Sequence, residues 1–276
     1  MKAKLIDGKK IAREITERAK RECADLGFKP GLGVVLVGDD PASHLYVSLK
    51  EKACREVGIA FERVFLAPDA PIALVLRAIE NFNRRTEIDA ILVQLPLPPH
   101  LDAGTVVAAM DPEKDVDGFH PDNVARLRNG APTIVPGLAA GILALAKASG
   151  EPLAGKRALV VANSPEFYAP LEVTLRSAGL EPSYAKPDDA GGRTREADLV
   201  IVAVGIPGWL TGVMVKPGAI VIDVGTNKVD GKTVGDADAS VLEVAGHVTP
   251  VPGGVGPVTV AMLVKNAVAL AKRRRL

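Results

Sequence analysis

Along the chain, short apolar runs alternate with segments in which apolar residues recur at helical spacing. The apolar runs predict buried strands at 33–37, 90–95, 157–162, 199–204 and 219–224, and segments 60–66 and 247–251 also have strand character. Helices are predicted at 9–26, 45–57, 71–84, 137–147, 170–177 and 258–274. Strands that alternate with helices indicate parallel sheets with both faces covered. The predicted fold class is therefore α/β.

The alternation of strands and helices occurs in two series that meet near residue 137. We predict a first α/β domain over 1–137, which the C-terminal helix at about 258–276 joins by packing back on it. The second domain, over 138–257, is predicted to be a Rossmann-like, doubly wound parallel sheet. In such sheets, ligands bind at the carboxyl ends of the strands, so polar residues there are candidate site residues.

Length, charge and cysteine content narrow the class of protein. The chain has 276 residues and a net charge of +1, which argues against a nucleic-acid surface. Cys23 and Cys54 both fall in predicted helices and are expected to be reduced and structural, a cytosolic pattern. We expect no signal peptide, no stretch that approaches a membrane span, and a solvated helix end at 272–275. These features predict a cytoplasmic protein.

The stretch from Asp39 to Cys54 is predicted to be a turn that leads into a helix. Ser43 is the expected N-cap, and Pro41 is expected to precede the helix, where its missing N–H does no harm. Apolar residues then recur at a spacing of four and mark one helix face: Leu45, Leu49 and Ala53.

Tyr46 and Lys50 lie four residues apart, so their side chains are neighbours on the same helix face. The phenol can stack on a substrate ring, and the amine can move a proton if burial lowers its pKa toward neutrality. Two other interpretations exist. Such pairs occur on many solvated helices, and short-chain dehydrogenases use Tyr-x-x-x-Lys after a glycine-rich loop, of which nothing before Tyr46 gives a sign.

Polar residues at two further positions are candidates for the same site. Gln94 lies in an apolar run, where its amide needs partners; it could orient Lys50 without adding charge, or bind nearby backbone. The pattern Asp115-x-Asp117-Gly118 suggests calcium, but an EF-hand loop in this register would end on a valine instead of a bidentate acid. The four histidines lack metal-ligand spacing, so we predict no metal site.

Residues 249–259 combine three glycines and three prolines immediately before the last helix. A loop of this composition has a fixed shape and brings backbone amides close to a ligand. We therefore expect it to contribute to a binding site.

Several long stretches, in this order, together resemble the methylenetetrahydrofolate dehydrogenase/methenyltetrahydrofolate cyclohydrolase family over nearly the whole chain. They are Ile6–Lys9, Val35–Ser43 with Tyr46 and Lys50, Leu92–Pro98, Lys114–Pro121, Val202–Gly205, Val221–Gly225 and Thr249–Pro257. The resemblance implies two α/β domains with a folate cleft between them, and a homodimer formed through the second domain. The first domain would be the folate-binding catalytic domain, and the second would bind the nucleotide.

The resemblance also implies an activity in one-carbon folate metabolism. NADP would oxidise 5,10-methylenetetrahydrofolate, and the methenyl product would be hydrolysed to formyltetrahydrofolate. Lys50 would be the central catalytic residue, with Tyr46, Gln94 and Asp117. The implied substrate-binding residues are Tyr46, Leu95, Pro96, Asp117, Pro252, Gly253 and Gly254, and the implied cofactor-binding residues are Ala162, Asn163, Ser164, Gly205 and Thr226.

The expected nucleotide loop departs from the family pattern Gly-Arg-Ser-x-x-Val-Gly-x-Pro. Residues 162–170 retain only Ser164 and Pro170 of it, and Tyr168 stands at a glycine position with Glu166 beside it. Because glycines let amides approach a phosphate, we expect NADP to bind more weakly than with the intact loop. Two alternatives follow: a cyclohydrolase with little or no dehydrogenase activity, and a non-catalytic folate-binding partner.

Overall fold

The computed structural model describes residues 2–131 and 133–276, which form two compact units. The six-stranded unit contains Leu138–Thr259 together with the N-terminal segment through Ala12. The three-stranded unit contains Arg13–Gly137 together with Val260–Leu276. The sequence prediction placed residues 1–12 with the first domain, whereas in the structure they pack with the six-stranded unit.

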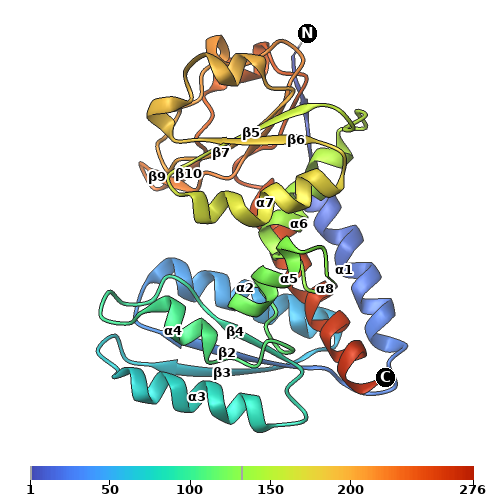
Figure 1. The fold of residues 1–276 in the computed structure, drawn as a ribbon, viewed down its shortest axis with the longest axis vertical. Coiled ribbons are helices and arrows are strands. Elements are labelled where there is room, and N and C mark those ends of the chain that lie inside the picture. The colour runs from blue at the N-terminus through green and yellow to red at the C-terminus, as the bar shows by residue number, and fades with distance from the viewer. Residues whose placement is uncertain (1, 132) are drawn as a thin grey trace. The chain divides into compact units, whose positions relative to one another are not determined.

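The three-stranded unit is a parallel sheet with strand order β3-β2-β4 (Figure 1). Its strands are β2 (Gly31–Val37), β3 (Ala60–Leu66) and β4 (Ala90–Val93), and its helices are α2 (Pro41–Val57), α3 (Ile72–Arg84), α4 (Ala103–Ala108), α5 (Pro121–Arg128), with most of α1 (Gly8–Ala24) and α8 (Val255–Arg275). Short α4 and α5 were not predicted from the sequence.

Side chains of β2 alternate between two apolar clusters, which explains the continuous apolar run. Leu32, Val34 and Leu36 pack with residues of α1, α2 and α8, whereas Val35 and Val37 pack with residues of α3 and α4. Gly33 lies over the ring of Phe82, and a Cβ there would come within 2.8 Å of ring atoms. Both faces of this sheet are therefore covered, as expected for parallel strands.

The segment after α4 adds a short strand-like stretch beside β4. The amide of Ile91 donates to the carbonyl of Lys114 at 2.7 Å, and the amide of Val116 donates to the carbonyl of Ile91 at 3.2 Å. Lys114 is 1% exposed, and its ammonium donates to the carbonyls of Phe82, Asn83 and Arg85 at the end of α3. These bonds fix the start of segment 114–118 against the sheet.

The six-stranded unit is a parallel sheet with strand order β1-β11-β8-β7-β5-β6. Its elements are β1 (Lys4–Leu5), α6 (Gly137–Ala148), β5 (Arg157–Ala162), α7 (Pro165–Ser177), β6 (Glu181–Ala185), β7 (Leu199–Ala203), β8 (Ile220–Asp223), the β9 (Asn227–Val229) and β10 (Lys232–Val234) hairpin, and β11 (His247–Val248), with short 3-10 turns at Pro187–Asp189, Gly191–Glu196, Gly212–Met214 and Ala239–Glu243. From β5 the chain adds β6 on one side, and it then crosses to β7 on the other side and continues through β8 to β11, beside which the N-terminal β1 pairs. The switch point of this doubly wound sheet therefore lies between β5 and β7.

Several of these elements differ from the sequence predictions. β1, β6 and the hairpin were not predicted, and α7 begins at Pro165 instead of residue 170. β1 is only two residues long and is a strand because it pairs with β11, which a local pattern cannot indicate. β6 contains Pro182 and two polar residues, so its apolar content is too low for the pattern to indicate a strand.

Helix α8 corrects two expectations about the end of the chain. By length and composition it is apolar enough to cross a membrane, contrary to the expectation that no stretch approaches a span, but 61% of its apolar window is buried inside the protein. Its terminal arginines are also not simply solvated: Arg273, Arg274 and Arg275 form ion pairs with Glu113, Asp111 and Asp89. Its burial and its ion pairs therefore identify α8 as a core helix, most of which belongs to the three-stranded unit.

Candidate functional site

Helix α2 begins earlier than predicted, and its cap is Asp40 instead of Ser43. The carboxylate of Asp40 accepts hydrogen bonds from the amide of Ser43 at 2.8 Å and from its hydroxyl at 2.7 Å. Pro41 is the first residue of the helix, where its fixed φ suits the first turn. Because Asp40 follows β2 closely, the helix starts directly at the carboxyl edge of the sheet.

The buried face of α2 is not the predicted one. Leu45 is 57% exposed and Leu49 is 43% exposed, whereas Ser43, Val47, Cys54 and Val57 are buried. Spacings of three and four join these buried residues, and Lys50 falls on the same stripe between Val47 and Cys54. The amine of Lys50 is thereby directed toward the sheet, and Tyr46 lies half-buried one turn before it.

Lys50 meets Gln94 at the carboxyl end of β4. Its Nζ donates to Oε1 of Gln94 at 2.9 Å, and Nε2 of Gln94 donates to the carbonyl of Leu95 at 2.6 Å. The two roles considered for the amide are therefore combined in one side chain. Because the Gln94 amide group is bound at both ends, it presents a neutral acceptor to Lys50. Leu95 is half-buried and Pro96 is exposed.

Burial dominates the electrostatics around Lys50. It lowers the pKa of the Lys50 amine, and the carboxylate of Asp117 opposes this effect by raising that pKa. Burial raises the pKa of Asp117. The charge of Lys50 lowers this pKa, and the charge of Asp115 raises it. Cys54, one turn along α2, is fully buried and its pKa is raised by burial to about 12, so it is a neutral thiol beside the amine. The arrangement favours a neutral amine at lower pH than in solution.

The segment that carries Asp117 is held by a dense set of hydrogen bonds. The buried carboxylate of Asp115 accepts from the amides of Gly118 and His120 and from the side chain of Asn123. Gly118 has a φ of +73°, and a Cβ there would lie 2.9 Å from the carbonyl oxygen of Ile134. Asp115 thus builds the turn, which leaves the carboxylate of Asp117 available for other contacts.

In the six-stranded unit, the predicted cofactor residues lie at the carboxyl ends of β5, β7 and β8. Ala162 ends β5, and the side chain of Asn163 donates to the carbonyl of Val204 after β7 at 3.0 Å. Ser164 is the N-cap of α7 without a side-chain cap hydrogen bond. Asn163 thereby connects the two loops that flank the switch point, and the start of α7 follows directly.

Gly205 and Thr226 lie on loops that a buried carboxylate organises. Oδ2 of Asp236 accepts from the amides of Val204 and Gly205 at 2.7 and 3.0 Å, and its Oδ1 accepts from Asn227 at 2.8 Å. Gly205 and Thr226 are both exposed. One buried side chain therefore fixes the turn after β7 and the start of the hairpin after β8.

Tyr168 does not occupy the approach to this edge, which corrects one basis of the expected weak NADP binding. Its ring stacks on Tyr184 of β6 with centroids 5.6 Å apart, and its hydroxyl donates to the carbonyl of Pro182 at 3.1 Å. The side chain packs α7 against β6. The exposed Glu166 remains as the acidic residue in the first turn of α7.

The proline- and glycine-rich loop packs against the N-terminal segment of the same unit. A Cβ on Gly8 would lie 2.0 Å from the carbonyl oxygen of Gly254, so only glycine fits there. Gly253 has a φ of +108° and lies under the methylene chain of Lys9. Two stretches of the family resemblance, 6–9 and 249–257, are therefore in contact. Pro252 is exposed, whereas Gly253 and Gly254 are buried.

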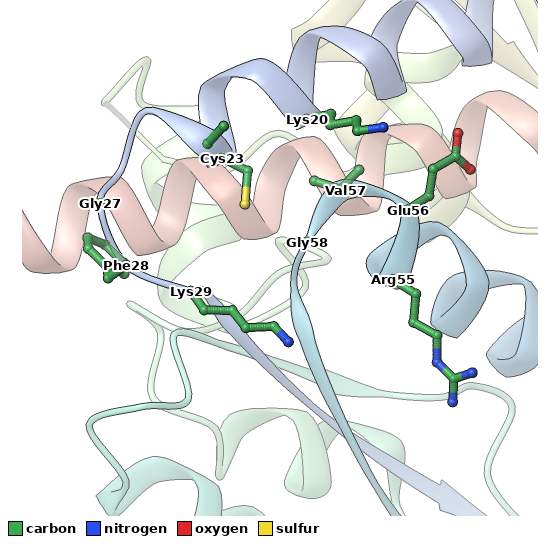
Figure 2. A pocket seen from close by; sticks show the side chains of 10 residues that line it. Lys20, Cys23, Gly27, Phe28, Lys29, Arg55, Glu56, Val57 and Gly58 are labelled. Carbon is green, nitrogen blue, oxygen red and sulfur yellow. The ribbon is translucent and has the colours of Figure 1, made fainter.

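A hollow of about 460 Å³ in the three-stranded unit lies away from this chemistry (Figure 2). Figure 2 shows Lys20, Lys29 and Arg55 around it, with Cys23 projecting from α1. It borders the last turns of α1 and α2 and the starts of β2 and β3, the amino edge of the sheet, whereas Lys50 and Gln94 meet at the carboxyl edge. In the part of the chain that the structure describes, no group of three or more His, Cys, Asp or Glu side chains is placed to hold a metal ion.

Three polar residues that shape these sites were not predicted from the sequence. Lys114 and Asp236 each organise backbone next to a candidate site residue, and Asn266 of α8 donates to the carbonyls of Val116 and Val135. A signal for Asn266 was present, because it is a lone amide in a long apolar helix.

The comparisons with known proteins agree over the whole chain. Residues 6–117 match the family model of the tetrahydrofolate dehydrogenase/cyclohydrolase catalytic domain, and residues 136–275 match that of its NAD(P)-binding domain. The bifunctional protein FolD of Exiguobacterium sibiricum is 45% identical over 98% of this chain and 100% of its own length. FolD of Methanospirillum hungatei is 44% identical over 98% of both chains.

Two solved structures have the same fold at full length. The bifunctional FolD methylenetetrahydrofolate dehydrogenase/cyclohydrolase of Campylobacter jejuni is 40% identical with a TM-score of 0.94, covering 99% of each chain. The Trypanosoma brucei FolD, solved with NADP and an inhibitor, is 35% identical with a TM-score of 0.93, covering 99% of this chain and 98% of its own.

These findings confirm the predicted α/β fold with a Rossmann-like second domain, the bifunctional activity, and the folate substrate and NADP cofactor. They favour neither the cyclohydrolase with little dehydrogenase activity nor the non-catalytic partner. The chain belongs to the tetrahydrofolate dehydrogenase/cyclohydrolase family.

Proposed function

We propose that the chain oxidises 5,10-methylenetetrahydrofolate with NADP and hydrolyses the methenyl product, and that Lys50 is the proton-transfer group of the hydrolysis. The observation that carries this assignment is the bond between Lys50 and Gln94. A neutral acceptor holds the amine in place without raising its pKa as a carboxylate would, while burial lowers that pKa. The neutral amine is then available at lower pH than that of a lysine in water.

In the hydrolysis, the oxygen of a water molecule bonds to the methenyl carbon, and one water proton passes to the neutral amine of Lys50. The bond between that carbon and one ring nitrogen then breaks, and its electron pair stays on the nitrogen. Lys50 returns the proton to this nitrogen. The remaining hydroxyl proton leaves to solvent as the formyl carbonyl forms.

We assign substrate binding in the same unit to Tyr46, Asp117, Leu95 and Pro96. The rigid turn around Asp115 supports Asp117 as an acceptor for the amino and ring N–H groups of the pterin. Tyr46, one turn from Lys50, would stack on the folate. Pro252, Gly253 and Gly254 are assigned to folate as well, supported by their rigid loop.

The switch point of the six-stranded unit fits a dinucleotide. Asn163 and Ser164 precede α7, whose first-turn amides carry partial positive charge toward the sheet edge and favour a phosphate. Ala162, Gly205 and Thr226 complete the assigned cofactor residues. These residues would hold NADP, which would supply the hydride acceptor for the oxidation of the folate. Lys186 follows β6 at the same edge and is the candidate partner of the 2′-phosphate.

Two assays on the purified chain test the proposal. One follows NADP reduction with methylenetetrahydrofolate, and the other follows hydrolysis of methenyltetrahydrofolate without nucleotide. We expect both activities. Hydrolysis without NADP or NAD reduction, together with no nucleotide binding by calorimetry, would restore the cyclohydrolase-only alternative. Folate binding without either activity would restore the non-catalytic partner.

The proposal includes a homodimer formed through the six-stranded unit, and a cytoplasmic location. The free, buried thiols of Cys23 and Cys54 support a reducing compartment. Light scattering of the purified chain would give the oligomeric state, and a monomeric mass at micromolar concentration would exclude the dimer.

A further inference from the structure

The side chain of Asn266 connects two separate backbone segments of the three-stranded unit. Its Nδ2 donates to the carbonyl of Val116 at 3.1 Å and to the carbonyl of Val135 at 3.1 Å. The residue is 8% exposed and lies on α8 between buried apolar residues. A single amide in this setting is costly to bury unless its hydrogens are bound, and here both are directed to carbonyls.

The two segments that Asn266 connects also contact each other around Asp117. Gly118 packs so closely against residues 134–136 that a Cβ would lie 2.9 Å from the Ile134 oxygen and 3.2 Å from Cδ of Pro136. Val116, whose carbonyl Asn266 binds, immediately precedes Asp117. The backbone on one side of Asp117 is therefore held by α8, and the other side by the packing of Gly118.

From this geometry we propose that Asn266 is a positioning residue, which sets the place of the Asp117 carboxylate relative to the Lys50 amine. The inference rests on the proposed function of Lys50 and Asp117. Asn266 contacts neither substrate nor reacting atoms, and it acts through the carbonyl of Val116. Removal of both donors frees segment 116–118 to shift, and the charge coupling between Asp117 and Lys50 weakens.

The titratable groups around the pair fix the direction of the effect. Asp117 and Cys54 act on Lys50, and Lys50 and Asp115 act on Asp117. Because the Asp117 carboxylate raises the pKa of Lys50, weaker coupling lowers that pKa. The ascending limb of the hydrolysis rate against pH then moves to lower pH, and the KM for methenyltetrahydrofolate rises.

The test uses Asn266→Leu in the full-length enzyme, which keeps the number and branching of the side-chain heavy atoms but removes both donors. Val268→Ala is the matched control, because Val268 is also buried on α8 and belongs to the apolar cluster. We expect Asn266→Leu to lower kcat/KM for hydrolysis at least threefold and to move the limb to lower pH. Val268→Ala should lower the melting temperature but leave the limb in place.

A double-mutant cycle with Asp117→Asn separates positioning from general loosening. If Asn266 acts through Asp117, Asn266→Leu adds no further displacement of the limb in the Asp117→Asn background. The inference would be overturned if the ascending limb of Asn266→Leu lay at the same pH as in the wild type. It would also be overturned if the displacements of the two single variants were additive in the double variant. If Asn266→Leu does not fold, Asn266→Gln, which moves the amide by one methylene, is measured in its place. Lack of hydrolysis in the unmodified chain would instead overturn the proposed function.

Discussion

The amine of Lys50 and the amide oxygen of Gln94 are 2.9 Å apart, and the amide nitrogen of Gln94 donates to the carbonyl of Leu95. This geometry directs the oxygen of the Gln94 amide toward Lys50. An uncharged partner matters, because the protonation of a catalytic amine depends on the charge placed beside it. The bond joins helix α2 to the end of strand β4 and brings together residues that are 44 positions apart.

Replacement of Lys50 by methionine should abolish the hydrolysis of methenyltetrahydrofolate while folate still binds. Lys50→Arg should not restore the rate, since guanidinium stays charged and has a different shape. Hydrolysis assays and calorimetry with folate check both expectations. Lys52→Met, at an exposed lysine on the same helix, is the control and should retain the normal rate. Substantial hydrolysis by the Met variant would rule out Lys50 as the proton-transfer group.

Gln94→Glu should move the ascending limb of the hydrolysis rate to higher pH. The new carboxylate would favour the protonated amine and raise the pKa of Lys50, so the neutral form appears only at higher pH. Gln94→Leu removes the acceptor and should reduce the rate without this displacement. A rate profile from pH 5 to 10 measures both, and an identical limb in Gln94→Glu would mean that Gln94 does not act on Lys50.

Asp117→Asn should move the same limb in the opposite direction. The Asp117 carboxylate raises the pKa of Lys50, so its removal lowers that pKa and the neutral amine persists at lower pH. Asp117→Ala should also weaken folate binding at least about tenfold, since a hydrogen bond to a charged group contributes roughly 1.5–3 kcal/mol. Calorimetry measures the affinity. The exposed Asp122→Asn is the control, and unchanged folate affinity in Asp117→Ala would make Asp117 a turn residue only.

Arg275→Ala should destabilise the protein by about 3 kcal/mol, because it leaves the fully buried Asp89 carboxylate without its cation. Arg275 donates to both oxygens of Asp89, and its guanidinium carbon lies 4.6 Å from the ring centre of Phe28. Arg273→Ala breaks only a half-exposed pair with Glu113 and should cost under about 1 kcal/mol. Urea unfolding compares the two variants; equal losses would contradict the assignment.

Asp236→Asn should impair the oxidation much more than the hydrolysis. The carboxylate accepts from the amides of Val204 and Gly205, and an amide side chain cannot accept from three donors through both of its ends. The loops at the switch point lose their fixed geometry, so nucleotide affinity should fall. Parallel NADP titration and hydrolysis assays check this. Equal loss of both activities would indicate general unfolding instead.

The sequence predicted the parts of this fold that depend on local pattern. The strand at 33–37 is apolar throughout because two clusters cover its faces, and its prediction was close to the observed β2. The pairing of Lys50 with Gln94 was one of the two roles considered for that amide, because a buried amide must have a partner. The buried face of α2 was mispredicted, since Leu45 and Leu49 carry the stronger hydrophobic signal and yet lie outward.

Features that depend on distant contacts could not be predicted. Only the pairing with β11 makes a strand of Lys4–Leu5, and only the packing against β6 decides where the ring of Tyr168 lies. The bonds of Asn266 and Arg275 reach across more than a hundred residues of sequence. The sequence contains those residues but no local pattern that identifies their partners.

The pairing of β1 with β11 and the place of α8 in the three-stranded unit have a consequence for synthesis on the ribosome. The first strand has no partner until β11 has been made, and the three-stranded unit lacks its last helix until residue 276 leaves the exit tunnel. Both units therefore stay incomplete until β11 and α8 have been made, although domains of most chains fold in order from the N-terminus. A nascent chain released early would expose apolar strands of both sheets at once, which makes truncated products of this protein targets for chaperones and proteases.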